Sequence, residues 1–210
     1  MKLQPCYKGM AVLVATIVLI TLAGLARAAE FSAETIIDQL GQKQKVRLYI
    51  KGQNMRQEMV DTFGQKQILI TGPGMGQTFM LYPETKTYMA LPAVAALSPV
   101  GQDDEALKKI GTRQLIGQEN VNGYLCDKYE IVFHNKYRGR MIVWVARKLN
   151  YPIRMTQVDG PPAGALHREL TNIEEGGVSD SLFKVPGDYR EIKKPVQGFC
   201  GAGVCTVSFY

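Results

Sequence analysis

The chain has 210 residues, of which 46% are hydrophobic, and it carries 25 Lys and Arg against 19 Asp and Glu, a formal net charge of +6. This length suits a single domain with a real core. Three of the positive charges lie in the first 28 residues, so the remainder holds 22 basic and 19 acidic residues, a balance of +3. That density of Lys and Arg argues against a nucleic-acid-binding protein, which concentrates basic residues on one face.

Residues 1–28 have the pattern of a secretory signal peptide. Lys2 and Lys8 precede an apolar run from Gly9 to Ala26, and Ala-Arg-Ala at 26–28 matches a cleavage site. The alternative is an uncleaved anchor, because ~18 apolar residues can span a bilayer. The placement of the Ala-x-Ala motif favours cleavage, which leaves 182 residues beginning at Ala29.

Three cysteines follow the leader, Cys126, Cys200 and Cys205, while Cys6 leaves with it. Export implies an oxidising compartment in which disulfides persist. The loop C-G-A-G-V-C favours a local disulfide between Cys200 and Cys205, with Cys126 as a buried thiol, although spacing alone does not determine connectivity. A C-x4-C metal site is the alternative, but two ligands without a nearby His do not close a tetrahedral site.

The first part of the exported chain predicts antiparallel strands. Residues 30–40 fit a helix or a strand, and the alternation F-S-A-E-T-I favours a strand. Between Lys45 and Pro92, short two-sided segments separated by turn residues predict a β-meander; they are K-V-R-L-Y-I-K-G, M-R-Q-E-M-V, Q-I-L-I-T, T-F-M-L-Y and K-T-Y-M-A-L-P. Val46, Leu48 and Ile50 alternate with charged residues, which predicts one solvated face.

The pattern changes between residues 92 and 110, where Ala and Leu replace β-branched residues. Asp103 or Asp104 can cap a short helix in which Leu107 and Ile110 share a face, and Gly111 ends it. The preceding residues 92–99 fit a second short helix or a packed loop. We expect both pieces to lie against the sheet.

Strands resume after this segment, in R-Q-L-I-G-Q-E, Y-L-C-D-K-Y-E-I-V-F-H, G-R-M-I-V-W-V-A, P-I-R-M-T-Q-V and A-L-H-R-E-L-T-N-I. Turn residues at 121–123 and 159–164 predict hairpin connections. Residues 141–146 are apolar on both faces, so we expect cover on both sides, with residues 92–110 as one cover. Ser179 or Asp180 should cap a helical turn before a strand that starts at Val185, and V-C-T-V-S-F-Y is a last strand or a packed knob.

The motifs of enzyme chemistry are not found in the sequence. His134 and His167 have no Cys or carboxylate at metal-ligand spacing, and no serine sits in a G-x-S-x-G elbow. G-P-G-M-G at 72–76 lacks the Lys-Ser/Thr ending of a phosphate loop, so a glycine-rich hairpin is the better interpretation. We therefore expect neither catalysis nor a cofactor.

Large, soft apolar side chains are unusually frequent on the expected strands. Methionine adapts to irregular apolar partners, so this surplus indicates either ordinary core filling or a half-open sheet with an apolar concavity, a common type of ligand site. The residues are Met55, Met59, Met80, Met89, Met141, Met155, Phe79, Tyr82, Tyr88, Tyr124, Tyr129, Phe133 and Trp144.

Several of these stretches together resemble the periplasmic lipoprotein-carrier superfamily (LolA/LolB-like), and most closely a branch of exported bacterial proteins. They are R-L-Y-I-K-G-Q-N-M-R-Q-E-M, T-F-M-L-Y-P-E-T-K-T-Y-M-A-L-P, N-G-Y-L-C-D-K-Y-E, V-W-V-A-R-K-L-N-Y-P-I-R-M and S-L-F-K-V-P-G-D-Y, and the likeness spans residues 31–192. The resemblance implies a mainly β (α+β) fold, a curved antiparallel sheet forming an incomplete β-barrel, or half-barrel, that covers short helices. The implied organisation is a leader at 1–28, a half-barrel domain at 29–192 and a tail with the Cys200/Cys205 loop at 193–210.

In carrier members of the superfamily, the inner cavity holds lipid acyl chains. We therefore hypothesise a periplasmic, non-enzymatic protein that binds a lipid or a lipidated protein, with a role in outer-membrane lipoprotein sorting or envelope lipid transport. The expected wall and core of the cavity are Leu48, Ile50, Met59, Phe79, Leu81, Met141, Val143 and Trp144, and the expected lid is Leu97, Leu107 and Ile110.

Arg56 is the expected polar residue at the mouth of the cavity, because related sequences have a recurrent strand arginine at this place. Alternatively, Arg56 forms a cross-strand ion pair near Glu58.

A second hypothesis is an envelope protein-interaction or stress-sensing module without bound lipid, whose partners would be envelope membrane proteins. A filled core or an exposed apolar outer patch would favour this second class. A hydrolase is a third class, and it lacks a nucleophile that can be paired with a base.

Overall fold

The computed structural model describes residues 29–39, 42–61, 63–92, 104–135, 137, 139–159, 166–192, 200–201 and 204–205. The leader expected at 1–28, the segment 93–103 with Leu97, and most of the connection at 159–164 lie outside the described residues. Among the helices that are described, none is long and apolar enough to cross a membrane.

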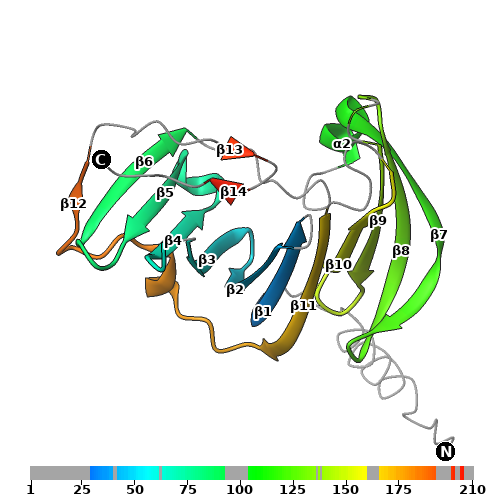
Figure 1. Cartoon of the computed structure of the whole chain (residues 1–210). Coiled ribbons are helices and arrows are strands. Elements are labelled where there is room, and N and C mark those ends of the chain that lie inside the picture. Colours follow the sequence, from blue (N-terminus) through cyan, green and yellow to red (C-terminus); the bar gives the residue numbers. More distant parts are fainter. Residues whose placement is uncertain are drawn as a thin grey trace, which may run out of the picture.

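A single twelve-stranded sheet dominates the described structure (Figure 1). Its order is β12-β6-β5-β4-β3-β2-β1-β11-β10-β9-β8-β7, so the two meanders meet at β1 and β11. The strands are β1 (Glu30–Gln39), β2 (Gln42–Lys51), β3 (Asn54–Val60), β4 (Lys66–Thr71), β5 (Gln77–Tyr82), β6 (Thr87–Pro92), β7 (Gly111–Val121), β8 (Tyr124–Phe133), β9 (Arg140–Ala146), β10 (Tyr151–Gln157), β11 (Leu166–Glu175) and β12 (Arg190–Glu191).

Short elements accompany the sheet. The 3-10 turn η1 (Pro73–Met75) joins β4 to β5, which confirms a glycine-rich connection at this place, and α2 (Asp104–Ile110) leads directly into β7. The 3-10 turn η3 (Asp180–Phe183) begins at the predicted cap Ser179, whose Oγ accepts a hydrogen bond from the Ser181 amide. A small pair, β13 (Cys200–Gly201) and β14 (Val204–Cys205), forms a second sheet.

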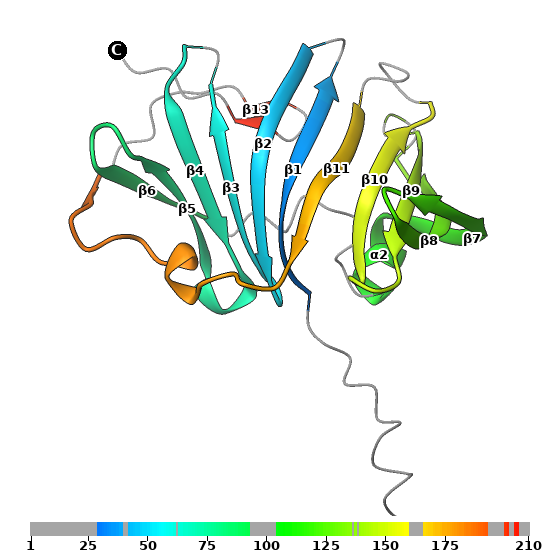
Figure 2. The same ribbon diagram turned by 90° about the horizontal axis from the view of Figure 1, so that it is seen from below.

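The large sheet is open and bent into a trough (Figures 1 and 2). Its neighbouring strands pair antiparallel, except that β12 runs parallel to β6. Register shifts in the β1–β11, β9–β10 and β7–β8 pairings mark β-bulges, which add bend and twist to a sheet. The expected incomplete half-barrel is confirmed, with β12 and β7 as unjoined edges.

Strand alternation gives the trough an inner and an outer face. On β2, Val46, Leu48 and Ile50 are buried on the inner face, next to Phe31 and Ala33 of β1. The intervening Lys45, Arg47 and Tyr49 lie on the outer face. The predicted solvated face of this strand is therefore the outside of the trough.

A strap of residues 176–192 crosses the outer side of β2–β6 (Figure 2). Its Val178 and Phe183 are buried against Ile70 and Leu81. The Lys51 ammonium lies 2.9 Å from the Asp180 carboxylate and anchors the start of η3. The strand expected from Val185 is shorter, because regular pairing with β6 begins only at Arg190.

Helix α2 packs on the inner face of the second meander, β7–β10, whereas the strap packs on the outer face of the first. Leu107 is buried with Met141 and Val143 of β9, and Ile110 packs beside them. Trp144 and Ala146 of the same strand join a separate core cluster. The prediction that residues 141–146 are covered on both faces is confirmed, and α2 is one of the covers.

The cysteines follow the sequence expectation where the structure describes them. Cys126 is a free thiol with no exposed surface, and burial raises its pKa. The backbones of Cys200 and Cys205 are directly paired across β13 and β14. This register suits the expected disulfide, which stays a prediction.

Candidate functional site

The inner face of β3–β6 carries a group of apolar side chains, the inner strip: Met55 and Met59 on β3, Leu69 on β4, Met80 on β5, and Met89 and Leu91 on β6. Strand register places Leu69 beside Met80 and Met80 beside Met89, while Gln57 lies opposite Leu69 and between the two methionines of β3. Met80 and Met89 are buried, whereas the other four are half-buried. Methionine side chains can repack around ligands of irregular shape, so the strip is a suitable surface for an apolar ligand.

Polar groups border the inner strip on one side, and they are satisfied. The Tyr82 hydroxyl lies 3.0 Å from the Met80 sulfur, and burial, with the charge of Asp61, raises the pKa of Tyr82 to about 12. The Asp61 carboxylate accepts a 3.0 Å hydrogen bond from the buried Gln67 amide. Tyr82 is therefore neutral at physiological pH and contributes a weakly polar rim.

Arg168 of β11 occupies the inner face in the middle of the sheet. It pairs with Ile37 on one side and Met155 on the other. Its Nε donates a 3.3 Å hydrogen bond to Thr35 Oγ1, and Thr35 in turn donates to the Glu169 carbonyl oxygen. The Nη2 atom of Arg168 is buried without a hydrogen-bond partner.

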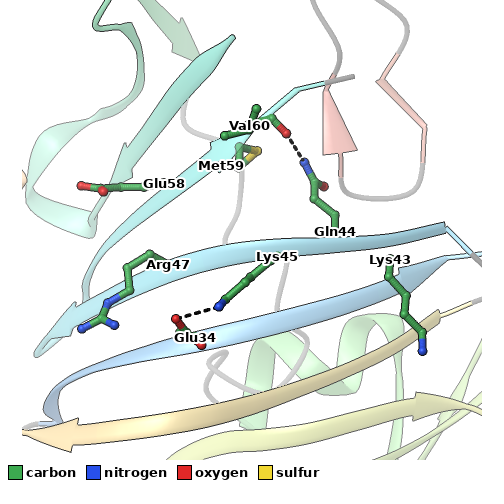
Figure 3. Close-up of a pocket in the computed structure, with 8 residues that line it drawn as sticks. All are labelled: Glu34, Lys43, Gln44, Lys45, Arg47, Glu58, Met59 and Val60. Atoms are coloured by element: carbon green, nitrogen blue, oxygen red, sulfur yellow. Dashed lines mark hydrogen bonds and ion pairs between the residues drawn. The ribbon is translucent and has the colours of Figure 1, made fainter. Parts of the chain in front are cut away.

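Two open depressions lie at the surface of the sheet, and Figure 3 shows the first, of about 470 Å³. It includes a Lys45–Glu34 ion pair at 2.9 Å and a Gln44 amide that donates to the Val60 carbonyl, and Met59 of the inner strip also lines it. The second, of about 440 Å³, is lined by Arg47, Glu174 and the start of the strap. The first lining is therefore of mixed character, and the second is the more polar of the two.

The expected wall residues divide between the two faces of the trough. Leu48, Ile50, Met59, Met141 and Val143 lie on the inner face, but Leu48 and Ile50 belong to one core cluster and Met141 and Val143 to another, under α2. Phe79 and Leu81 instead contact the strap on the outside, so their expected placement is corrected. Because side chains alternate along a strand, Met80 and Tyr82 take the inner positions of β5.

Trp144 is also placed away from the inner strip. Its ring lies between the Lys128 ammonium, 4.9 Å from the centroid, and the Arg154 guanidinium, at 5.4 Å. Its indole Nε1 donates a 2.9 Å hydrogen bond to Glu119. Trp144 is nevertheless only 8% exposed and packs in the core cluster that contains Leu48 and Ile50, so it is a core residue with charged neighbours.

Arg56 holds the strap and does not face the inner strip. Register with Tyr49 and Ile70 puts it on the outer face, where its Nε lies 2.7 Å from Glu58 and its Nη1 donates to the Leu182 carbonyl at 2.9 Å. Arg56 is therefore not at the mouth, and its ion pair forms with Glu58 within β3 instead of across strands. The lid residues Leu107 and Ile110 lie on the inner face, over β8–β10.

Arg168, Leu69 and Leu91 were not identified from the sequence as candidate site residues. The segment A-L-H-R-E-L did contain a signal for Arg168, because alternation along a strand puts Arg168 on the same face as Leu166 and Leu170. An arginine on the apolar side of an alternating strand is unusual, since charged residues are rarely buried without a partner. Within the part of the chain that the structure describes, no group of three or more potential metal ligands is found.

The chain belongs to the family described as Domain of unknown function (DUF4412), whose model matches residues 30–150. The matched region runs from β1 to the turn after β9, and so includes the inner strip and α2. No curated protein matches the chain.

Solved structures share the fold at low sequence identity. An uncharacterized conserved protein from Thermus thermophilus is 11% identical, with a TM-score of 0.56 over 88% of this chain and 99% of that one. MucB is 14% identical, with a TM-score of 0.55 over 84% of this chain and 64% of the MucB chain. MucB is also seen in a MucA/MucB complex from Pseudomonas aeruginosa, which is 15% identical with a TM-score of 0.53 over 94% of this chain and 64% of that one. The resemblance to the LolA/LolB-like superfamily is confirmed at the level of the fold.

Proposed function

We propose that this protein is a non-enzymatic binding protein of the bacterial periplasm that holds a lipid, or the acyl chain of a lipidated protein, on the inner face of its trough. The observation that carries the proposal is the inner strip. Six apolar side chains from four strands, four of them methionines, lie on one face there, with Gln57 and Gln67 among them.

Two features of the described structure support this assignment. The strap covers the outer face of β4–β6, whereas on the inner face it contributes Ile192, which packs against Met80 and Met89; the inner face of β3 and β4 is therefore the side we propose for the ligand. In addition, Met55, Met59 and Leu69 are only half-buried, so further apolar burial is available, at about 25 cal/mol for each Å² removed from water.

The protein-interaction module remains a second candidate, favoured by a different surface. Leu115 and Leu125 share one face of the β7–β8 pair and are 52% and 46% exposed, whereas Val132, which is 40% exposed, lies on the other face. The strand β7 is also an edge of the sheet. Exposed apolar side chains at a sheet edge are typical of interaction sites. The MucA/MucB complex shows that a protein of this fold associates with another protein.

A variant pair on β3 tests the lipid proposal. Full-length protein exported to the periplasm is extracted and analysed for bound lipid, and uptake of a fluorescent fatty acid is measured in solution. M59E places a carboxylate in the inner strip and should abolish uptake. V60E changes the next residue, which is 48% exposed on the other face, and should leave uptake unchanged.

The outcome separates the two candidates. Absence of bound lipid, together with no uptake by the wild-type protein, overturns the lipid proposal and favours the interaction module. L115E and L125E probe the second surface, and they should not affect fatty-acid uptake. If L115E and L125E abolish fatty-acid uptake and M59E does not, the binding surface lies at β7–β8.

A further inference from the structure

Arg168 carries an unmatched hydrogen-bond donor on the inner face. Its Nη2 is buried and has no partner, while its Nε is bound only to the neutral Thr35 hydroxyl. A guanidinium group stays charged at all relevant pH values. Buried polar atoms without partners are rare in native proteins, and each calls for an explanation.

Five of the seven other arginines that the structure describes have a carboxylate partner, while Arg113 lies over the Tyr129 ring. Each of the five lies within 3.3 Å of an Asp or Glu oxygen, in the pairs Arg47–Glu174, Arg56–Glu58, Arg140–Asp159, Arg147–Asp127 and Arg154–Glu169. The side chain that follows Arg168 in sequence, Glu169, lies on the opposite face of β11 and binds Arg154 and Asn122. Arg168 is therefore a cationic group that lacks the anionic partner found at these five sites.

The surroundings of Arg168 are apolar and lead to the inner strip. Met155 beside it and Leu170 two residues along are both buried. The row that starts at Leu170 continues across the sheet through Thr35 and Val46 to Met59. Leu170, Thr35 and Val46 are at most 1% exposed, so a ligand that reaches from Arg168 to Met59 must replace the contacts that already bury this row. Strands are about 4.8 Å apart, so β11 and β3 are separated by about 14 Å, a span that an acyl chain of medium length can bridge.

These observations combine one unpaired cation with an adjoining apolar surface. We propose that the ligand of the inner face is an anionic single-chain lipid, whose carboxylate or phosphate oxygen accepts a hydrogen bond from Arg168 Nη2 while its acyl chain lies along the inner strip. The inference rests on the proposed function and specifies the ligand's headgroup. Charge-assisted hydrogen bonds from arginine to an oxyanion are among the strongest in proteins, so Arg168 should determine headgroup preference.

Binding of two ligands with the same chain length tests the headgroup. Isothermal titration calorimetry is carried out on the full-length exported protein with decanoate and with decanol. The wild type should bind decanoate at least tenfold more tightly than decanol. R168Q should reduce affinity for decanoate about tenfold and change affinity for decanol less than twofold, whereas R168K should retain a preference for decanoate.

Arg47 supplies the matched control, because it lies on the outer face of β2 and is already paired with Glu174. R47Q should bind both ligands as the wild type does. Inorganic phosphate alone should not bind, since it lacks the chain; tight binding of phosphate would indicate a free-anion site and overturn the lipid assignment. Thermal unfolding of each variant verifies that it is folded.

The failures of the two proposals are distinguishable. If the wild type binds neither decanoate nor decanol, the proposed function fails. If it binds both with equal affinity, or if R168Q weakens both equally, lipid binding stands and the anionic headgroup is excluded. The wild-type comparison alone decides the matter if R168Q does not fold.

Discussion

The two halves of the trough bury opposite faces with different covers. In the first half-sheet, β2–β6, the strap packs on the outer face and the inner strip is only partly buried. In the second half-sheet, β7–β10, α2 packs on the inner face, and Lys128 and Arg154 flank the buried Trp144 on the other face. The comparison shows that a strand pattern alone does not reveal which face will hold a ligand, because the cover comes from segments outside the strands.

The largest effect should follow from weakening the strap. F183A removes a side chain that is 6% exposed between the strap and β4–β5, and should lower the free energy of unfolding by about 4 kcal/mol, as is typical for a buried phenylalanine. Urea denaturation measures this change. K184A, at an exposed neighbouring position, serves as the control, and a loss below about 1 kcal/mol for F183A would show that the strap is not an integral cover.

A somewhat smaller effect is expected for the cover of the second half-sheet. L107A truncates the buried residue of α2 that contacts Met141 and Val143, and should cost about 3 kcal/mol of unfolding free energy. K109A changes an exposed residue of the same helix and should have little effect. If L107A also abolished decanoate binding, the ligand would contact the second half-sheet, contrary to its placement on the inner strip.

The next effect concerns Arg56, the expected mouth residue that instead anchors the strap. R56Q removes its contacts with Glu58 and the Leu182 carbonyl, and should destabilise the protein by about 2 kcal/mol, since hydrogen bonds to charged groups are worth roughly 1.5–3 kcal/mol. Amide hydrogen exchange near Leu182 should accelerate, while ligand affinity should not change. A loss of ligand affinity without faster exchange would return Arg56 to the binding site.

The smallest effect is a pH dependence in the second half-sheet. The Arg154 guanidinium, with Asn122 and His167, holds the pKa of Glu169 below its ordinary value of 4.5, although burial opposes this shift. A lowered folded-state pKa stabilises the protein above pH 4.5, and this contribution disappears as the pH falls through the folded value.

The variant E169Q should therefore show a flatter dependence of unfolding free energy on pH between about 5 and 3. Thermal unfolding over this range measures the slope. E174Q is the control, because Glu174 is exposed and contacts Arg47 on another part of the outer face. An unchanged slope in E169Q would indicate that the Arg154–Glu169 pair does not stabilise the fold.

Much of the strand order could be predicted from the sequence because alternation is a local property. The meander at 45–92, the hairpin at Val121–Gly123 and the short helix before Gly111 each depend on neighbouring residues. Asn122 and Gly123 indeed have positive φ angles of 49° and 84°, the conformation that an Asn-Gly hairpin turn requires. The double cover of β9 was also predictable, since its two faces are both apolar.

The candidate site was harder to predict, because the face of the sheet on which a side chain lies depends on strands that are distant in sequence. A shift of one residue moves a strand residue to the other face, and this is why Phe79 and Leu81 were assigned to the wall in place of Met80. Arg56 and Arg168 look alike in sequence, as single arginines on alternating strands. Only their neighbours distinguish them: Glu58 and the strap for Arg56, Thr35 and Met155 for Arg168.

The sequence by itself determined the strand ladder, the short helix and the twice-covered strand, because periodicity and turn chemistry act over a few residues. The tertiary structure decided that β1 and β11 join the two meanders, that the strap closes the outer face, and that Arg168 lies unpaired beside an apolar surface. These features arise from contacts between segments more than 100 residues apart, such as Thr35 with Arg168 and Arg56 with Leu182. The energies of such contacts depend on burial and geometry, which local sequence patterns do not encode.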